Sequence, residues 1–395
     1  MKIIWLMNEC PLPANTGGRI GMFKRLEQVS KANDVYLFYV CDSDEELNTS
    51  DALLKYCKKV FAYKRKKGIG NVLRSIKMPF TIVSRNIKRM QADIETLIEE
   101  ENPDLINVDF PQMCVNLVRI AKDHDIPIVL NEHNIEWQFY KQLSESGMKF
   151  PKKSIYAFDS KRLKKYEEKL VKKLSFSGIT FVSDRDMCYY KKWLGDVSDM
   201  IHIPVGADDR VVKQMPANGD CKKVVFVGLM SAAPNEEGAE WFALNVLPEI
   251  LKVYPKTVFY AVGKNPTDRV KCLAGDNVKV TGMVESVDNY YNDADLVVIP
   301  LFHGGGVKVK LLEAVSFARP IVSTSSGIEG TAFIPGKHLY VADSVDEFAE
   351  CCIKALSFDA DTEKMVKLSH EFFKKNYTWA EIGKKYCDFL YKATL

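Results

Sequence analysis

The chain has 395 residues and a formal net charge of +3, with 47% hydrophobic and 27% charged residues. This length exceeds one ordinary domain, so we expect two, and the composition is typical of a soluble globular protein. No apolar run reaches the roughly 18 residues of a membrane span, and the small net charge by itself indicates no class of partner.

The cysteines and histidines indicate neither a disulfide framework nor a metal site. The ten cysteines are scattered without a Cys-x-x-Cys pair, and the six histidines show no ligand spacing. We therefore expect a reduced, cytoplasmic protein without a bound metal. Residues 1–7 have too short an apolar core for a signal peptide and predict a first β-strand.

The first half of the chain alternates short apolar strands with helical segments. A helix is predicted over about 19–31, where apolar residues recur at helical spacing. The predicted strands cover 3–7, 35–40, 60–63, 105–108, 127–130, 179–182 and 201–203. Nearly continuous apolar strands that alternate with helices predict a parallel sheet covered on both faces.

The second half restarts this pattern after a polar, turn-rich stretch at 206–220. A helical segment is predicted at 239–253, and a last helix at about 379–391. The predicted strands cover 224–227, 258–262, 278–280, 296–299, 321–323 and 339–341. The sequence therefore predicts two doubly wound α/β domains, which bind ligands at the carboxyl ends of their strands.

Residues 303–313 form a glycine-rich turn between a predicted strand and a predicted helix. Such a turn lets an anion approach the helix N-terminus closely. Lys308 and Lys310 have the wrong sign for the helix dipole there, and a bound diphosphate explains them. Glu313 could accept hydrogen bonds from sugar hydroxyls. The alternative is an ordinary turn with solvated lysines.

Several motifs together resemble the retaining GT-B glycosyltransferases of family 4. They lie at 11–19, 131–134, 225–230, 234–242, 290–300, 304–314, 319–324 and 327–330. The resemblance implies two Rossmann-like domains that face a cleft. It implies an acceptor-side domain at 1–207, joined by the C-terminal helix 377–395, and a nucleotide-sugar-binding domain at 208–376.

The resemblance also implies the residues of a donor site. The resemblance assigns catalytic roles to His133 and Lys308. The implied donor-binding residues are Gly17, Gly18, Gly228, Gly263, Val284, His303, Gly304, Gly305, Gly306, Val307, Lys308 and Glu313. For Gly17 and Gly18 the alternative is a plain turn, and for His133 a structural histidine.

Two departures from the family pattern concern charged residues. The family often has two glutamates seven residues apart, of which the second corresponds to Glu313 and the first falls on Gly305. The usual Arg and Lys after the first C-terminal strand are absent. We expect Lys308 to take their place, because a departing diphosphate requires a nearby cation.

Residues 52–92 contain no Asp or Glu but many Lys and Arg, and a second basic segment covers 149–173. Cations interleaved with apolar residues suit an anionic membrane surface, which we expect residues 55–89 to contact. The alternative is a solvated, lysine-rich face. No nucleic-acid recognition module is visible, so no nucleic-acid partner is expected.

These features predict a cytoplasmic, hexosyltransferase-type enzyme, peripheral at the inner face of the cell membrane. It would transfer a sugar from a nucleotide-sugar, a UDP-sugar, to a carbohydrate or lipid-linked acceptor with retention, in cell-surface polysaccharide or glycolipid assembly. No cofactor or metal is expected. The alternatives are an epimerase of the same fold, which would need extra acid/base carboxylates, and a non-catalytic nucleotide-sugar-binding protein.

Overall fold

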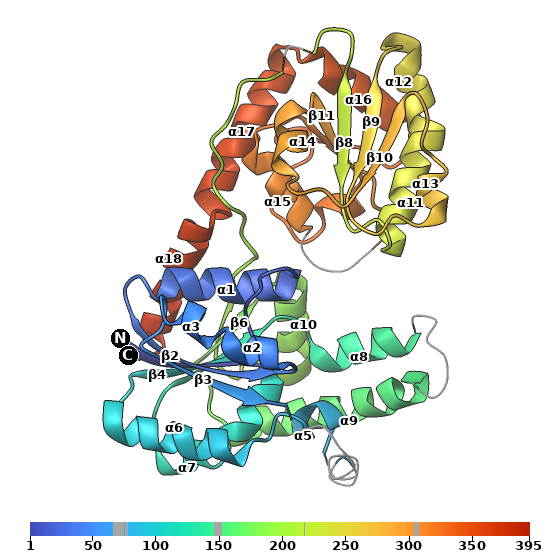
Figure 1. Ribbon diagram of the computed structural model, residues 1–395. Helices are drawn as coiled ribbons and strands as arrows, with labels where there is room; N and C mark the ends of the chain where they lie inside the picture. The colour runs from blue at the N-terminus through green and yellow to red at the C-terminus, as the bar shows by residue number, and fades with distance from the viewer. Residues whose placement is uncertain (66–74, 76–77, 146–151, 217, 304–307) are drawn as a thin grey trace. The chain divides into compact units, whose positions relative to one another are not determined.

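A computed structural model describes residues 1–65, 75, 78–145, 152–216, 218–303 and 308–395 (Figure 1). It divides into two compact units. Unit 1 comprises Met1–Pro204 and Ile382–Leu395, and unit 2 comprises Val205–Glu381. The first boundary therefore falls just before the polar stretch at 206–220, because residues from Val205 onward already pack within unit 2.

Unit 1 contains a sheet of seven parallel strands in the order β3-β2-β1-β4-β5-β6-β7. Its strands are β1 (Lys2–Met7), β2 (Asp34–Cys41), β3 (Lys59–Lys64), β4 (Leu105–Asp109), β5 (Ile128–Glu132), β6 (Gly178–Phe181) and β7 (Asp199–His202). Their side chains are largely buried, as expected for a parallel sheet with both faces covered.

The helices of unit 1 cover both faces of this sheet, with α1 on one face and α6 and α7 on the other (Figure 1). They are α1 (Gly17–Val29), α2 (Asp44–Asn48), α3 (Ser50–Leu53), α5 (Phe80–Val83), α6 (Lys88–Glu101), α7 (Ile120–Asp123), α8 (Glu136–Glu145), α9 (Lys152–Lys173) and α10 (Asp184–Leu194), with a 3-10 turn η1 (Pro111–Asn116).

Unit 2 contains a sheet of six parallel strands in the order β10-β9-β8-β11-β12-β13. Its strands are β8 (Lys223–Val227), β9 (Val258–Val262), β10 (Val278–Gly282), β11 (Leu296–Ile299), β12 (Ile321–Ser323) and β13 (Tyr340–Val341). One continuous hydrophobic core surrounds this sheet.

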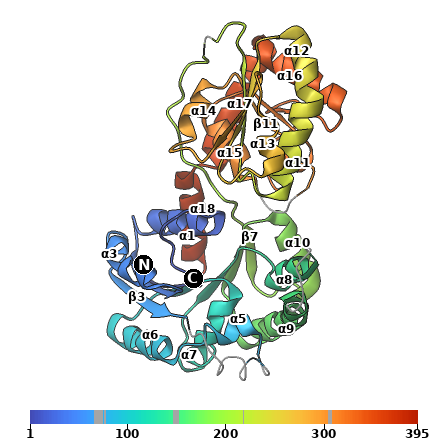
Figure 2. The same ribbon diagram turned by 45° about the vertical axis from the view of Figure 1, so that its right-hand side comes forward.

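Helices also cover both faces of the second sheet, with α11, α12 and α16 on one side and α14, α15 and α17 on the other (Figures 1 and 2). They are α11 (Ala233–Trp241), a π-helical turn η2 (Phe242–Val246), α12 (Leu247–Val253), α13 (Asp268–Lys271), α14 (Asp288–Asp293), α15 (Val309–Ser316), η3 (Ser326–Ile328), α16 (Val345–Ser357) and α17 (Ala360–Asn376).

The last helix, α18 (Trp379–Lys392), begins in unit 2 and packs within unit 1 from Ile382 onward. Tyr386 is fully buried there, and its hydroxyl lies 2.8 Å from Asn131 Oδ1 and 2.8 Å from Asn107 Nδ2. The apolar side of this helix is therefore buried within unit 1, through Ile382, Tyr386, Phe389 and Leu390.

The prediction of two doubly wound parallel sheets is confirmed, and all thirteen predicted strands are present. In each sheet the strand order reverses beside the first strand, between β1 and β4 in unit 1 and between β8 and β11 in unit 2. Ligands of such folds bind outside the carboxyl ends of the strands at this point. Within the described ranges, no helix has the length and apolar character to cross a bilayer.

Candidate functional site

In unit 1, the carboxyl ends of β4 and β5 bring Asp109 and His133 together. His133 Nε2 lies 2.9 Å from Asp109 Oδ1, and Trp5 Nε1 donates to Asp109 Oδ2 at 2.7 Å. Because the carboxylate only accepts, His133 carries its proton on Nε2, and Nδ1 is free to accept from Arg25 Nη2 at 3.4 Å. The sequence-predicted His133 is thus held in one tautomer.

This network is buried and its charges are matched. Burial alone would raise the pKa of Asp109, but the hydrogen bond from His133, the charge of Arg25 and the hydrogen bond from Trp5 hold it below its ordinary value. Burial, together with the Arg25 charge, lowers the pKa of His133 despite Asp109. The site therefore contains an ionised Asp109, a charged Arg25 and a neutral His133.

The backbone next to Asp109 is strained. Phe110 has φ of 69°, a region that bulky side chains rarely adopt. Its ring stacks on the His133 ring with centroids 4.2 Å apart. Strain of this kind persists where the surroundings determine the conformation, and it is common at functional sites. Phe110 therefore packs against one face of the His133 ring.

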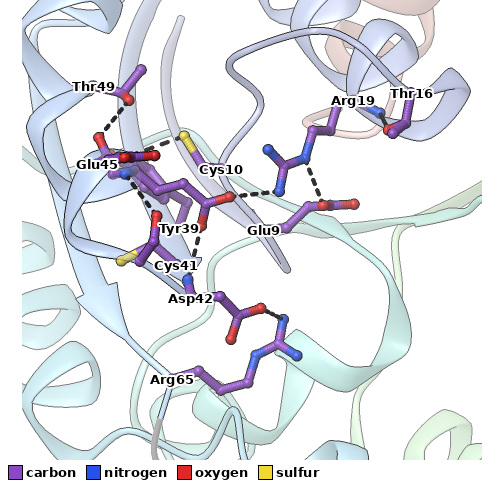
Figure 3. Close-up of polar contacts among 12 residues, drawn as sticks. Glu9, Cys10, Thr16, Arg19, Tyr39, Cys41, Asp42, Glu45, Thr49 and Arg65 are labelled. Carbon is purple, nitrogen blue, oxygen red and sulfur yellow. Dashed lines mark hydrogen bonds and ion pairs between the residues drawn. The ribbon is translucent and has the colours of Figure 1, made fainter.

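The predicted glycine turn of unit 1 lies at the start of α1. Gly17 and Gly18 are exposed, and a Cβ on Gly17 would meet no atom within 4 Å. Arg19 Nε donates to Glu9 Oε2 at 2.8 Å, and Arg19 Nη2 donates to Glu46 Oε1 at 2.7 Å. Figure 3 shows Arg19 directed toward Glu9 on the loop after β1. The Arg19 charge is therefore matched by two carboxylates.

A second buried group at the carboxyl end of β5 consists of Glu132, Glu136 and Glu167. Burial raises the pKa of Glu136 to about 7, and burial raises those of Glu132 and Glu167 well above the ordinary value. Glu136 Oε2 accepts from Gln112 Nε2 at 2.5 Å. Neither carboxyl oxygen of Glu132 has a hydrogen-bond partner among the described residues. Burial therefore favours the protonated form of all three side chains.

In unit 2, three neighbouring strands end on glycine. Gly228 follows β8 and its N–H donates to Val262 O at 3.0 Å. Gly263 follows β9 with φ of 148°, and a Cβ there would lie 1.7 Å from Gly228 O. Gly282 ends β10 with φ of 68°. The structure brings the predicted Gly228 and Gly263 together and shows that Gly263 cannot be replaced without moving the chain.

Lys310 extends from the first turn of α15 to this glycine edge. Its Nζ donates to Asn235 Oδ1 at 2.6 Å and lies 4.5 Å from the centre of the Phe226 ring. Asn235 Nδ2 in turn donates to Leu229 O at 2.8 Å. The ammonium group therefore lies at the turn after β8, the place where the family's usual cations are absent from this sequence.

Glu313 lies one turn further along α15 and is half-buried. Tyr291 Oη lies 3.5 Å from Glu313 Oε2. Burial raises the pKa of Glu313, and the charges of Arg210 and Lys310 oppose this effect. Glu313 is thus an acceptor in a partly desolvated position, which is compatible with the predicted role in binding hydroxyls.

The other predicted donor residues differ in exposure. Lys308 caps α15 and is only 8% exposed, and burial lowers its pKa against the opposing charge of Glu329. His303 Nε2 lies 2.7 Å from Glu237 Oε2. Val284 is half-buried against the core of unit 2. Gly304, Gly305, Gly306 and Val307 lie outside the described residues.

Five of the described cations in the sequence block at 55–89 are paired with acids from outside it. Lys59 lies 3.2 Å from Glu101, and Arg65 lies 3.1 Å from Asp42, as Figure 3 also shows. Further pairs join Lys58 to Asp34, Lys64 to Asp44 and Arg89 to Asp93. The absence of acids from this sequence segment therefore did not prevent these five described cations from forming ion pairs in the fold.

Asp109, Arg25 and Asn235 were not among the predicted site residues. Asp109 directly follows a predicted strand, so its position at a carboxyl end was available from the sequence. Arg25 lies on the buried side of α1, where a cation among apolar residues is unusual. Within the described residues, no group of three His, Cys, Asp or Glu side chains is arranged to hold a metal ion.

Comparison with known proteins agrees with this geometry. Residues 221–357 match the family model described as Glycosyl transferases group 1. An uncharacterized 44.6 kDa protein in the cps region of Klebsiella pneumoniae is 28% identical, and the match covers 95% of this chain and 96% of that protein.

Two solved structures share the fold. The Anabaena protein Alr3699/HepE in complex with UDP and glucose is 14% identical, with a TM-score of 0.65 and 99% of both chains covered. The lipopolysaccharide outer core galactosyltransferase WaaB is 13% identical, with a TM-score of 0.62 and 99% of both chains covered. The family match over most of unit 2, on a GT-B fold of two parallel-sheet units, indicates a glycosyltransferase.

Proposed function

We propose that this glycosyltransferase transfers a hexose from a UDP-sugar to an acceptor hydroxyl with retention of configuration, in the assembly of a cell-surface polysaccharide or glycolipid. The observation that carries the proposal is the carboxyl edge of unit 2. Three strands end there on glycine, beside a lysine and a glutamate on α15. Glycines admit a phosphate closely, and a lysine matches its charge.

Roles follow from the chemistry of the side chains. Glu313 accepts hydrogen bonds from the nucleotide ribose, and Lys308 stabilises the negative charge that develops on the leaving diphosphate. His133, neutral and held by Asp109, contacts the donor sugar. Cations and backbone amides do the electrostatic work of a metal, so the reaction needs neither a metal nor a cofactor. Support for the UDP donor comes from Alr3699/HepE, whose structure contains UDP and glucose.

The experiment is a screen of nucleotide-sugars with the full chain. Thermal stabilisation reports donor binding, slow hydrolysis reports activation of the donor, and NMR of the product reports the anomeric configuration. We expect a UDP-sugar to raise the melting temperature and to be hydrolysed or transferred with retention. A changed sugar configuration without release of UDP would indicate an epimerase, and stabilisation without any product would indicate a binding protein.

Two variants separate binding from chemistry. Glu313→Gln should weaken donor binding, and Lys308→Ala should lower turnover, because the Lys308 charge matters most when the diphosphate departs. A lost charge-assisted contact of about 1.5–3 kcal/mol corresponds to effects of roughly ten- to hundredfold. Glu371→Gln, on the exposed side of α17, is the matched control. Parent-like behaviour of both variants would contradict the donor site.

For the acceptor, we propose that unit 1 binds the anionic inner face of the cell membrane, where a lipid-linked acceptor is available to a cytoplasmic enzyme. Because the described cations of 55–89 are mostly ion-paired, we place the membrane-binding surface on α9. One side of this helix carries Arg162, Lys165, Lys169 and Lys173, spaced three or four residues apart.

These four cations line a groove of about 470 Å³ whose other walls are mostly apolar. The apolar lining includes Met78, Val115, Val118 and Leu170. Further along the same side of α9, Ile155 and Phe158 are 55% and 61% exposed. Exposed apolar side chains beside lysines that form no ion pair with a described residue are typical of a surface that binds lipid headgroups.

Vesicle binding tests this surface. Replacing Lys165, Lys169 and Lys173 with Gln should weaken binding to anionic vesicles roughly a hundredfold, at about 1 kcal/mol for each cation. The matched control replaces the ion-paired Lys59, Lys64 and Arg65 with Gln and should have a much smaller effect. Binding to anionic vesicles should weaken as salt rises. Equal binding to neutral and anionic vesicles would contradict the proposal.

A further inference from the structure

Arg85 is a buried cation of unit 1 that, unlike Arg65 and Arg89, pairs with no acid among the described residues. It is 8% exposed, and its Nη1 donates to Thr81 O at 3.0 Å and to Thr81 Oγ1 at 2.8 Å. Its Nε is buried and has no hydrogen-bond partner. Burying a guanidinium is costly unless an opposite charge and hydrogen bonds compensate it, so this side chain indicates an anionic partner.

Other unpartnered polar atoms lie at the carboxyl edge of the first sheet, together with Arg85. Arg85 belongs to this edge because it precedes α6, which crosses from the carboxyl edge back to the start of β4. The atoms are Asn8 Oδ1 after β1, Arg65 Nε after β3, Gln112 Oε1 after β4 and both carboxyl oxygens of Glu132 on β5. Because native structures satisfy nearly all buried polar atoms, such a group at one edge points to a ligand.

The charges around Arg85 favour a ligand that is an anion. Burial lowers the pKa of Arg85 to about 10, and the charge of Arg65 adds to this effect. The groups that oppose it are Tyr140 and Glu136 on α8 and Asp42 after β2. Asp42 already pairs with Arg65 (Figure 3), and burial raises the pKa of Glu136 to about 7. Neither carboxyl group therefore gives Arg85 a full counter-charge near neutral pH, and ordered water supplies hydrogen bonds without charge.

We propose that Arg85 and Arg65 bind the phosphate of a sugar phosphate, which is the acceptor either free or as the head of a lipid. This inference rests on the proposed function, in which unit 1 binds the acceptor. The planar guanidinium groups donate to the phosphate oxygens. Gln112 Nε2 donates to Glu136, which leaves Oε1 to accept from a sugar hydroxyl. A sugar phosphate thus satisfies the unpartnered donors and acceptors of this edge together.

The test is calorimetry on the full chain with glucose 1-phosphate, inorganic phosphate and glucose, in the presence of UDP to fill the donor site. The parent should bind glucose 1-phosphate at least as tightly as inorganic phosphate, and glucose much more weakly than either. The hexyl diester of glucose 1-phosphate distinguishes the two sources. A site for a lipid head accepts the added chain, whereas a site for a free sugar phosphate excludes it.

Variants of the two arginines test their role. Arg85→Gln should weaken glucose 1-phosphate binding roughly ten- to hundredfold and leave UDP binding unchanged. Arg85→Lys keeps the charge without the fork of donors and should restore only part of the affinity. Arg65→Gln, at a more exposed position, should weaken binding in the same sense. The matched control is Arg119→Gln, an exposed arginine paired with Glu95, which should bind like the parent. Melting curves verify that the variants are folded.

The pH dependence gives a readout that a purely structural role of Arg85 would not change. Above pH 7, ionised Glu136 places a competing negative charge in the field of Arg85. Glucose 1-phosphate binding to the parent should therefore weaken several-fold between pH 7 and about 8.5, although the phosphate, with a second pKa of about 6, is fully charged there. Glu136→Gln should remove this weakening.

The outcomes separate this inference from the proposed function. If Arg85→Gln and the parent bind glucose 1-phosphate equally well, or if the parent binds UDP but not glucose 1-phosphate, the inference is overturned and the proposed function stands. Glucose binding as tight as glucose 1-phosphate binding would overturn it, as would equal weakening of UDP and glucose 1-phosphate binding in Arg85→Gln. If glucose 1-phosphate binds as expected but no UDP-sugar is bound, the phosphate site stands and the proposed function is overturned.

Discussion

The two switch points each hold a buried or partly buried cation, and they differ in what matches its charge. In unit 1, Arg25 lies in the field of Asp109, which also accepts from His133 and Trp5. In unit 2, Lys310 has an amide partner and no carboxylate partner among the described residues. The cation of the first switch point is electrostatically matched as it stands, whereas the cation of the second has no carboxylate partner among the described residues. This difference supports the proposal that the second edge binds the charged part of the donor.

The glycines at the carboxyl edges of the two sheets also differ, in whether the fold itself requires them. Gly263 is required by its own backbone, since a side chain there would overlap Gly228 O. Gly17 has open space around it. The glycines of unit 2 therefore belong to the structure of the edge itself, whereas Gly17 is free to serve a ligand.

The largest effect is expected for Gly263→Ala. The φ of 148° at Gly263 is strained for any residue with a side chain, and an added Cβ would lie 1.7 Å from Gly228 O. The substitution should therefore lower the free energy of unfolding by on the order of 3–5 kcal/mol. Chemical denaturation would measure the loss, and UDP binding should be lost with it. Gly275→Ala is the control, because no atom lies within 4 Å of its Cβ position. Equal stability of the two variants would contradict this account of the edge.

The next effect concerns Glu136 in unit 1. Its pKa is raised to about 7 in the folded chain, so the folded state holds a proton that the unfolded chain releases above about pH 4.3. The stabilisation that protonated Glu136 gives the folded state is therefore complete below about pH 4.3, and it is lost as the pH rises toward 7.

Glu136→Gln removes this loss and keeps an acceptor for Gln112. At pH 8 the variant should be more stable than the parent by on the order of 3 kcal/mol, and near pH 4 the two should be similar. Denaturation curves at both pH values measure the difference, with Glu371→Gln as an exposed control. A variant that is destabilised equally at both pH values would refute the buried-acid interpretation.

A smaller effect is expected for Asp109→Asn. The amide offers one acceptor oxygen where the carboxylate serves both Trp5 and His133, so one buried donor loses its partner at a cost of about 1–3 kcal/mol. The depressed pKa of Asp109 stabilises the parent above about pH 3.9, and this stability is lost as the pH falls through the lower folded value. The variant should lack this acid-dependent loss, which pH-dependent melting would reveal.

The fold was largely predictable because its strands are short, apolar and separated by clear helical segments. The strand at 258–262 was predicted at both ends, since a buried parallel strand shows up as a continuous apolar run. The return of α18 to unit 1 came from the family resemblance, and the strand order came from the structure. The first domain boundary depended on packing, which no local pattern encodes.

The site was predictable only in part, because charge matching depends on contacts between distant residues. The block at 55–89 lacks acids in sequence, yet Lys59 meets Glu101 and Arg65 meets Asp42 in the fold. Both Lys308 and Lys310 were visible in the motif, but only the structure shows that Lys310 reaches Asn235. The sequence therefore singled out this segment without distinguishing its two lysines.

The smallest change in stability, and a sharp test of the comparison, is expected for Gly17→Ala. Gly17 begins α1 in open space, so alanine should fit and should stabilise the chain by about 0.4–1 kcal/mol through reduced freedom of the unfolded state. If the turn contacts the donor, as the resemblance implies, the added methyl group should weaken UDP-sugar binding several-fold despite this gain. Melting curves and donor titrations on the same preparation measure both effects. We expect higher stability with lower affinity, a combination that a purely structural turn cannot produce. Unchanged affinity would show that the donor is bound without this turn, by an edge whose glycines and lysines all lie in unit 2.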